Sequence, residues 1–315
     1  MVRLGQVATP RLKRDQVLVR VRASAVTTAD YRFRASVFPT PFWLPGRLML
    51  GLFRPRNPVL GMDFSGVVEA VGSAVSRFRV GDAVFGATEP MRRGAHAEFI
   101  AMPESGAIIH KPESLTHQQA AAIPFGASCA LDFLRDVARV QAGQRVLILG
   151  ASGAVGVWAV QLARQLGAEV TGVCSTRNLE LVRSLGAHHV LDYTAGSLFP
   201  EGKTYDLIFD TAGITSFANC RAALSDNGTY LPLESGLREM GQVLVTSLRR
   251  GKKVRFSVSK NTRQGLEQIV ELIASGALTP VVDRVYPMQE IADAHRHVES
   301  RHKRGSVVVA MGAAE

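Results

Sequence analysis

The sequence predicts an α/β protein in which a β-rich N-terminal part precedes a doubly wound parallel sheet. Three observations support this fold class. Residues 1–110 contain short β-type runs separated by Gly-Asp and Pro, with little helical periodicity. From about residue 146 onward, short apolar runs alternate with helical patterns, which is typical of parallel strands joined by right-handed crossovers. The length of 315 residues exceeds one average domain, so we expect two domains.

The individual elements follow from the period of the apolar residues. In the N-terminal part, the patterns predict strands at 17–23, 65–71, 83–85 and 97–101, followed by helices at 118–122 and 127–138. In the middle of the chain, strands predicted at 146–149, 170–174, 189–192, 207–210, 229–233 and 254–258 alternate with helices that include 179–185 and 217–224. The chain closes with a predicted helix around 266–273, a strand at 281–285, a helix at 291–298 and a strand at 306–310.

The most informative stretch lies between Arg145 and Arg177. The strand predicted at 146–149 is followed by Gly150-x-x-Gly153-x-x-Gly156, after which apolar residues recur at helical spacing. Glycines let a backbone approach closely, and the N-terminus of a helix offers free N–H groups and a partial positive charge, which suits a pyrophosphate. We therefore expect a dinucleotide to be surrounded by Gly150, Ser152, Gly153, Ala154, Val155 and Gly156. An ordinary strand–helix turn without a ligand is the alternative.

The next predicted strand ends at Cys174 and is followed by Ser175-Thr176-Arg177. Sites that prefer NAD usually place Asp or Glu here, where the carboxylate binds the ribose 2′-hydroxyl. Hydroxyls and a guanidinium suit a 2′-phosphate instead. The stretch therefore predicts NADPH as the cofactor, with Ser175, Thr176 and Arg177 at its 2′-phosphate.

The composition is typical of a soluble enzyme. The chain has no run of 18 or more apolar residues, and its N-terminus lacks the apolar region of a signal peptide, so we expect a cytoplasmic protein without membrane insertion. The three cysteines are widely spaced, which argues against a disulfide framework. The formal charge of +10 raises the question of nucleic acid, but the basic residues are scattered apart from clusters at 249–255 and 301–304. We expect a solvated basic surface; attraction for an anionic cofactor and nucleic-acid binding are the alternatives.

Four stretches, spread over essentially the whole length, carry a family pattern. They are Pro58-x-x-x-Gly61-x-Asp63-x-x-Gly66 with its continuation to Gly81-Asp82, AAAIPFGASCAL at 120–131, the glycine motif, and AHRHVESRHKRGSVVV at 294–309. With these motifs the chain resembles the medium-chain dehydrogenase/reductase superfamily, and within it the zinc-independent quinone oxidoreductase branch. The resemblance implies a GroES-like catalytic domain made of residues 1–119 and 262–315. It also implies a Rossmann domain at residues 120–261 that binds the cofactor.

Zinc alcohol dehydrogenases of this superfamily bind a catalytic metal at positions that correspond here to Thr27, Met62 and approximately Phe125. A thioether and an aromatic ring cannot replace imidazole and thiolate around Zn²⁺. The eight histidines show no spacing typical of metal ligands. We therefore expect no metal.

Without a Lewis acid, hydride transfer to an already activated acceptor is the easier reaction. A quinone, or the β-carbon of an α,β-unsaturated carbonyl, spreads the incoming charge onto an oxygen. The hypothesis is an NADPH-dependent quinone or enone reductase. Within the enzyme class the alternative is an enoyl-thioester reductase, and outside it a low-turnover protein that binds NADPH or RNA under stress.

Further site residues come from position and from the resemblance. A small-residue turn after the strand at 207–210 favours Ala212 and Gly213 beside the nicotinamide ribose, with a plain turn as the alternative. The resemblance implies that Tyr193 lies near the 2′-phosphate, with a surface tyrosine at the strand end as the alternative, and that Phe256 and Ser257 meet the nicotinamide. Lys303 or Arg304 is expected to add positive charge near the 2′-phosphate, with a solvated tail as the alternative. The resemblance places Thr27 as a hydrogen-bond donor to the acceptor oxygen and Tyr31 as a proton donor, although the family's tyrosine falls one place later, at Arg32. Asp30 and Arg34 are expected to form a structural ion pair.

Residues 35–60 form an apolar, aromatic and proline-rich segment that is longer than a normal connection. The functional interpretation is that Phe38, Phe42 and Trp43 wall the acceptor pocket. A loop packed on the catalytic domain or on a dimer surface, or a contact with a membrane surface, are the alternatives. Because relatives commonly dimerise, a homodimer is expected.

Overall fold

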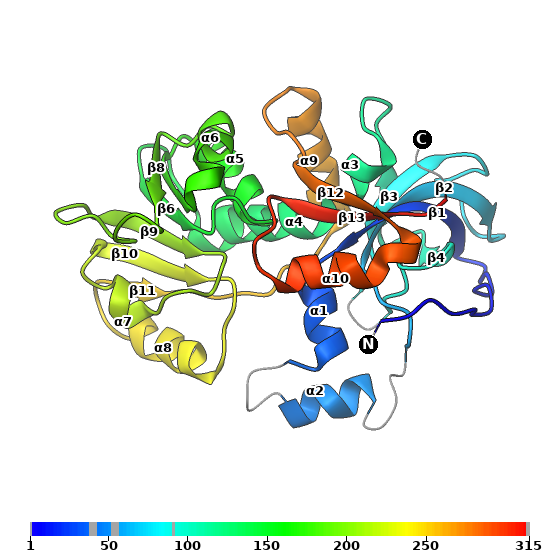
Figure 1. The fold of residues 1–315 in the computed structure, drawn as a ribbon, viewed down its shortest axis with the longest axis horizontal. Helices are drawn as coiled ribbons and strands as arrows, with labels where there is room; N and C mark the ends of the chain where they lie inside the picture. Colours follow the sequence, from blue (N-terminus) through cyan, green and yellow to red (C-terminus); the bar gives the residue numbers. More distant parts are fainter. Residues whose placement is uncertain (1, 38–42, 52–56, 90–91, 313–315) are drawn as a thin grey trace.

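The computed structural model describes residues 2–37, 43–51, 57–89 and 92–312, which form two β-sheets flanked by helices (Figure 1). This confirms the predicted α/β class with a GroES-like domain and a Rossmann domain. No helix in the described part of the chain has the length and apolar character needed to span a bilayer.

The catalytic domain is built on a seven-stranded sheet drawn from both ends of the chain. Its strands, given in sheet order, are β12 (Val282–Pro287), β13 (Ser306–Ala310), β1 (Gln16–Val26), β2 (Asp63–Val71), β3 (Ala83–Ala87) and β5 (Ala107–His110), while β4 (Phe99–Pro103) also pairs with β1. All pairings are antiparallel except that of β12 with β13. Alternating apolar residues such as Val17 and Val19 of β1 are completely buried, which explains why this domain reads as β-rich in the sequence.

The Rossmann domain contains six parallel strands. In sheet order they are β11 (Lys253–Val254), β10 (Leu224–Pro232), β9 (Tyr205–Asp210), β6 (Arg145–Leu149), β7 (Glu169–Cys174) and β8 (His189–Asp192). The chain runs outward from β6 through β7 to β8 and then returns to place β9 on the other side of β6. The crevice at such a reversal is where doubly wound sheets bind their ligands.

Helices cover both sheets (Figure 1). Those of the Rossmann part are α5 (Gly156–Gln165), α6 (Leu179–Ser184), α7 (Phe217–Cys220) and α8 (Leu237–Ser247), with a short 3₁₀ turn at Thr176–Asn178. Between the sheets lie α3 (His117–Ala121), α4 (Pro124–Leu131), the π-helix η2 (Asp132–Ala138) and α9 (Arg263–Ala274). The catalytic domain adds α1 (Thr28–Ala35), α2 (Trp43–Leu50), a 3₁₀ turn at Met288–Glu290 and α10 (Ile291–Glu299).

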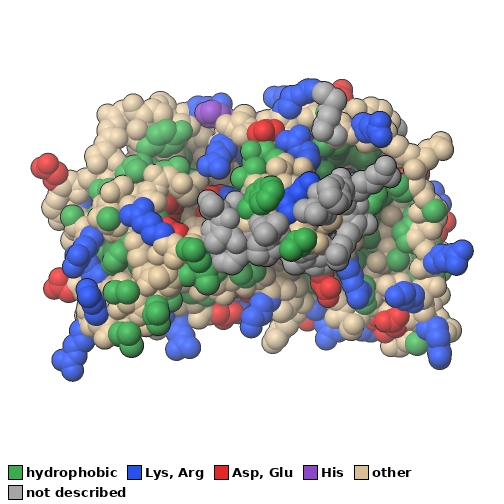
Figure 2. Space-filling view, turned by 90° about the horizontal axis from the view of Figure 1, so that it is seen from below, with side chains coloured by type: hydrophobic (Ala, Val, Ile, Leu, Met, Phe, Trp, Pro, Cys, Tyr) green, Lys and Arg blue, Asp and Glu red, His purple; other side chains and the backbone are tan. Residues whose placement is uncertain are grey.

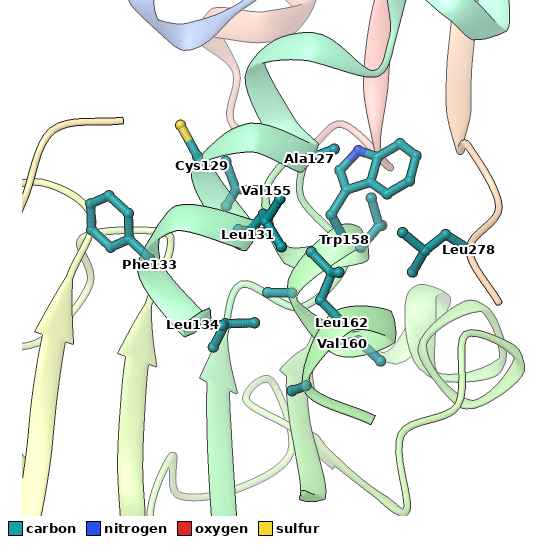
Figure 3. Packing of buried hydrophobic residues seen from close by; sticks show 14 of the residues in the cluster. Ala127, Cys129, Leu131, Phe133, Leu134, Val155, Trp158, Val160, Leu162 and Leu278 are labelled. Carbon is teal, nitrogen blue, oxygen red and sulfur yellow. The ribbon is translucent and has the colours of Figure 1, made fainter. Parts of the chain in front are cut away.

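The largest core cluster lies where α4, η2 and α5 meet the parallel sheet (Figure 3). Trp158 of α5 is almost completely buried, and Phe133 of η2 stacks on Phe209 of β9 with ring centroids 5.6 Å apart. Burying an aromatic side chain removes a large apolar area from water, so these contacts fix the helices on the sheet. These helices therefore support β6 and β9, whose ends lie on either side of the predicted cofactor site.

The structure adds helices α1, α2 and α8 and strand β5, which the sequence analysis did not predict, and it changes the bounds of several predicted elements. The helix predicted at 127–138 becomes π-helical from Asp132, and the wider turn buries the neighbouring residues Phe133 and Leu134 together. Strand β10 starts at Leu224 rather than at 229, because Leu224 pairs with Tyr205 and a bulge accommodates the intervening turn-like residues. Strand β11 contains only Lys253–Val254 of the strand region expected at 254–258.

Candidate active site

The predicted glycine turn joins β6 to α5 and requires glycine at two positions. Gly150 has a φ of +76°, and a Cβ atom there would lie 2.8 Å from the Cβ of Ala212. A Cβ atom on Gly156 would lie 2.1 Å from the carbonyl oxygen of Gly150, which is closer than any real contact. A Cβ atom on Gly153 would lie 3.3 Å from the carbonyl oxygen of Gly150, so glycine is less strictly required there than at the other two positions.

The first turn of α5 has no side chain that caps it. The residue at the N-cap is Val155, which offers no oxygen to the free N–H groups. A diphosphate at this helix end would accept hydrogen bonds from these groups and interact favourably with the helix dipole. The predicted turn residues therefore form a site that fits the cofactor diphosphate.

The residues expected at the 2′-phosphate lie together at the end of β7. The buried side chain of Asn178 donates to the Ser152 hydroxyl at 2.9 Å and to the Ser175 hydroxyl at 3.2 Å, so it links the glycine turn to the phosphate residues. The Thr176 hydroxyl donates to the Asp192 carboxylate at 2.6 Å, and Tyr193 beside it is exposed. Asn178 was not singled out in the sequence, because its role depends on two serines that are distant from each other along the chain.

Residues 302–305 of the catalytic domain lie against this end of the Rossmann sheet. The Gly305 N–H donates to the carbonyl of Ser152 at 2.8 Å, and the exposed guanidinium of Arg177 donates to the carbonyl of His302. The Lys303 ammonium donates to the Gly305 carbonyl at 3.3 Å. Burial lowers the pKa of Lys303 to about 8, although the nearby charge of Asp283 acts in the opposite direction. Lys303 and Arg177 therefore approach the same end of the predicted site from the two domains.

The loop after β9 is organised by a buried carboxylate that the sequence analysis passed over. Asp210 accepts hydrogen bonds from the N–H groups of Ala212 at 3.1 Å, Gly213 at 2.8 Å and Thr215 at 3.1 Å. Burial raises the pKa of Asp210, while these N–H groups pull it down. The carboxylate holds Ala212 and Gly213 beside the end of β6, where they were expected to meet the nicotinamide ribose.

The other residues expected at the nicotinamide are Phe256 and Ser257, which follow β11 and are half-buried. Their part in cofactor binding stays a prediction.

The two candidate catalytic side chains on α1 are both engaged within the catalytic domain. The Thr27 hydroxyl is the N-cap of α1: it donates to the Asp30 carboxylate at 2.7 Å and accepts from the Asp30 N–H at 3.2 Å. The ring of Tyr31 lies 5.6 Å from the Arg34 guanidinium. The expected ion pair between Asp30 and Arg34 is wrong, because Arg34 pairs with Glu299 of α10 at 2.7 Å. The Asp30 carboxylate is occupied instead by the hydroxyl and the N–H of Thr27 and by the N–H of Gly61 at 3.1 Å.

The positions that correspond to zinc ligands hold side chains without metal-binding chemistry. Thr27 and Met62 are buried, and the N–H of Phe125 donates to the Asp63 carboxylate at 3.0 Å. Within the described ranges, no three His, Cys, Asp or Glu side chains come together as a metal site. Asp63 itself is completely buried, and burial raises its pKa well above the ordinary value.

The aromatic segment is only partly covered by the structure. Phe38 and Phe42 lie outside the described residues, so their expected place in the acceptor pocket stays a prediction. Trp43 begins α2 and is 49% exposed, so it does not pack as a buried loop residue within a single chain.

Residues 13–113 match the family model described as alcohol dehydrogenase GroES-like domain, and residues 185–309 match the model described as zinc-binding dehydrogenase. The chain is 33% identical to the mitochondrial NAD(P)H oxidoreductase RTN4IP1 of Mus musculus, over 94% of this chain and 81% of that protein. It is 31% identical to the chloroplastic NADPH-dependent alkenal/one oxidoreductase of Arabidopsis thaliana, over 97% of this chain and 74% of that protein.

Among solved structures, the quinone oxidoreductase from Coxiella burnetii is similar over 96% of this chain and 93% of that chain. The TM-score is 0.85 and the sequence identity is 27%. Since two of the relatives named here carry organelle names, a cytoplasmic location stays a prediction.

Proposed function

The chain belongs to the quinone oxidoreductase-like branch of the medium-chain dehydrogenase/reductase superfamily, and from this premise we propose an NADPH-dependent reductase of quinones or α,β-unsaturated carbonyls that works without zinc. Its NAD(P)H-dependent oxidoreductase character follows from its relatives. The preference for NADPH rests on Ser175, Thr176 and Arg177, which stand at the end of β7 where NAD sites carry a carboxylate. This is the observation that carries the proposal.

Different groups of residues are proposed to bind different parts of the cofactor. The turn from Gly150 to Gly156 would hold the diphosphate, Arg177 and Lys303 the 2′-phosphate, and the loop fixed by Asp210 the nicotinamide ribose. When bound, the cofactor supplies the hydride. The protein orients the acceptor and stabilises the negative charge that develops on its oxygen.

Independence from zinc is supported by the side chains at the corresponding positions. The Thr27 hydroxyl is used to cap α1, and Met62 offers a thioether, which is a poor ligand for Zn²⁺. An acceptor that is already polarised does not need a Lewis acid, which is why quinones and enones are the proposed class.

The function is tested by following NADPH oxidation at 340 nm with a panel of quinones, enones, enals and CoA enoyl thioesters. We expect turnover with a quinone or an enone, and the same rate after treatment with a chelator. Faster turnover of the thioesters would favour an enoyl-thioester reductase, and strict dependence on added zinc would contradict the proposal.

Replacing Arg177 with alanine is expected to weaken NADPH binding by about tenfold to a hundredfold while changing NADH binding little. The reason is that a charge-assisted bond to the 2′-phosphate contributes about 1.5–3 kcal/mol, and NADH lacks that phosphate. Fluorescence titration with both cofactors measures the effect. Arg183→Ala, at the end of α6, is the matched control. An equal loss for NADPH and NADH contradicts the assignment.

The basic cluster at 249–255 gives little support to nucleic-acid binding. Three of its five basic side chains donate to backbone carbonyls: Lys252 to Arg221 at 2.6 Å, Lys253 to Thr246 at 2.7 Å and Arg255 to Val137 at 2.7 Å. Phosphate groups would have to compete with these bonds. The cluster is therefore better explained as capping of α8 and of neighbouring loops.

A homodimer is part of the proposal, and α8 supports it. The helix turns an apolar stripe toward solvent, made of Leu237, Met240, Leu244, Val245 and Leu248, of which Leu248 is 82% exposed. Hydrophobic side chains with Lys and Arg around them are visible on the face seen from below (Figure 2). Beside α8 lies β11, the edge strand of the sheet, so a second copy would cover the stripe and extend the sheet at once.

The dimer is tested by sedimentation velocity. The wild type is expected to sediment as a dimer and Leu244→Glu as a monomer, because a charge in the centre of an apolar interface is strongly unfavourable. Val80→Glu is the control, since Val80 is equally exposed elsewhere. A monomeric wild type at micromolar concentration contradicts the dimer.

A further inference from the structure

One ion pair joins the catalytic domain to the Rossmann domain near the predicted nicotinamide end of the crevice. It connects the guanidinium of Arg32, on α1, with the carboxylate of Glu234, two residues beyond the end of β10. The two side chains are 32% and 28% exposed, so solvent reaches both of them. In Figure 1, α1 lies below α10 in the catalytic domain.

The pair lies directly over the loop that Asp210 organises. A Cβ atom added to Gly213 would be 2.9 Å from Oε2 of Glu234, the same oxygen that pairs with Arg32. Next to Glu234, the buried hydroxyl of Ser235 has no hydrogen-bond partner among the residues that the structure describes. The guanidinium is thus held by a carboxylate that touches Gly213, where the nicotinamide ribose is proposed to lie.

Arg32 is the α1 side chain that is best placed to meet an acceptor. The Thr27 hydroxyl donates a hydrogen bond to Asp30, and Arg34 forms an ion pair with Glu299 within the catalytic domain. A guanidinium carries five N–H donors in a planar fork, and one carboxylate oxygen does not use them all. Donors therefore remain for a second oxygen in the crevice.

We propose that Arg32 binds the carbonyl oxygen of the acceptor and that Glu234 positions its guanidinium for this purpose. The inference rests on the proposed reductase function. As the hydride and its electron pair form the new C–H bond, the displaced π electrons move to the acceptor oxygen, which becomes an enolate or hydroquinone anion. The cofactor is oxidised by two electrons, the acceptor is reduced by two, and the N–H groups of Arg32 stabilise the anion.

The proton that completes the reduction comes from water in this scheme. A guanidinium does not give up its proton in proteins, so Arg32 stabilises the anion without protonating it. The scheme favours acceptors whose oxygen gains a full negative charge, which includes quinones and enones. It disfavours isolated alkenes, because they have no oxygen to receive the charge.

The same helix offers a matched control. Arg34 and Glu299 form a second Arg–Glu pair, with exposures of 22% and 44%, that stays inside the catalytic domain. Partly exposed pairs of this kind contribute little to folding, so Arg32→Ala, Arg32→Lys, Glu234→Gln and Glu299→Gln are all expected to fold. Circular dichroism and thermal unfolding verify this for each variant.

The first measurement needs no turnover. 4-Nitrophenol mimics the acceptor anion, and its yellow phenolate reports its own protonation state. On the wild type and on Glu299→Gln, with and without NADP⁺, the phenolate is expected to bind at least about tenfold more tightly than the phenol. Arg32→Ala should lose this preference. If Arg32→Ala retains it, or if the wild type binds both forms equally, Arg32 is not the oxyanion ligand.

The second measurement is steady-state reduction of a quinone or enone. Arg32→Ala is expected to lose about a hundredfold in kcat, with Arg32→Lys partly restored and NADPH affinity within about threefold of wild type. Glu234→Gln should lose less, and the double variant no more than Arg32→Ala, because both side chains act through one group. Glu299→Gln should keep wild-type kcat.

A loss of kcat below about threefold in Arg32→Ala overturns the inference. A wild type that does not bind NADPH refutes the proposed function instead, and the phenolate measurement then still decides the role of Arg32.

Discussion

Replacing Gly156 with alanine is expected to weaken NADPH binding by about a hundredfold, which is about 2.7 kcal/mol, and to destabilise the fold by about 2 kcal/mol. The added Cβ atom would lie 2.1 Å from the carbonyl oxygen of Gly150 and 2.8 Å from Cα of Ala151. Both contacts are with backbone, so no side-chain rotation relieves them. The first turn of α5 must move away from β6, and the N–H groups proposed for the diphosphate move with it.

Fluorescence titration with NADPH and urea unfolding measure the two effects. Gly241→Ala in α8 is the control, because an added Cβ atom there meets no atom within 4 Å. That variant is expected to bind NADPH like the wild type and to gain slightly in stability, since alanine favours a helix interior over glycine. NADPH affinity within about threefold of wild type in Gly156→Ala would show that the diphosphate does not bind at this turn.

Replacing His295 with leucine is expected to make the protein markedly more resistant to acid. His295 lies on α10 and is completely buried, and within the described part of the chain neither ring nitrogen has a hydrogen-bond partner. Burial, followed by the nearby His96 and Arg34, lowers the pKa of His295 to about 3. The ring of His96 lies 5.7 Å away in an edge-on arrangement, so the neighbour of His295 on that side is a second imidazole.

The sign of the effect follows from the lowered pKa. An unfolded histidine takes up a proton near pH 6.5, whereas His295 in the folded protein does so only near pH 3. Protons therefore favour the unfolded state between these values, and the histidine costs about 3 kcal/mol of stability on going from pH 7 to pH 4. Asp63 and Asp210 act in the opposite direction, because burial raises the pKa of each and acid neutralises them.

Comparison of variant and wild type isolates the histidine from these carboxylates. Urea unfolding at pH 7 should show the two proteins within about 1 kcal/mol of each other, and at pH 4 the leucine variant should be more stable by about 3 kcal/mol. His302→Gln, an exposed replacement, should follow the wild type at both values. Parallel pH profiles for His295→Leu and wild type would contradict the role assigned to the buried imidazole.

The parts of the fold that the sequence predicts well are those set by local chemistry. The spacing of the glycines predicts the turn between β6 and α5. Gly150 has a positive φ, and Gly156 packs against the carbonyl oxygen of Gly150 too closely for any side chain. The alternation of strands and helices after residue 146 follows from the apolar period, and this alternation predicts a parallel sheet with right-handed crossovers. The order of the strands in that sheet was not predicted.

The parts that were missed depend on contacts between distant segments. Asn178 is one polar residue among many until folding brings Ser152 and Ser175 beside it. Asp210 reads as the end of a strand, and only its burial reveals that it organises the following loop. Arg32 and Glu234 have no common pattern in the sequence, because they lie on different domains. Strand β11 is shorter than its sequence suggests, since an edge strand has a partner on one side only.

The position of β13 has a consequence for the order in which the protein is made. Ala23 of β1 lies opposite Ala310 of β13, so the middle of the catalytic sheet joins segments from the two ends of the chain. During translation the Ala23–Val26 part of one edge of β1 stays unpaired until β13 has left the ribosome, whereas Gln16–Arg20 pairs earlier with β4. At ordinary rates of synthesis this takes roughly 15 to 60 s, long enough for other chains to pair with that edge. All strands of the Rossmann domain come from one continuous stretch of the chain, so this domain does not depend on a distant segment. It is therefore expected to fold first, and the catalytic sheet is expected to be completed on it when β13 pairs with β1.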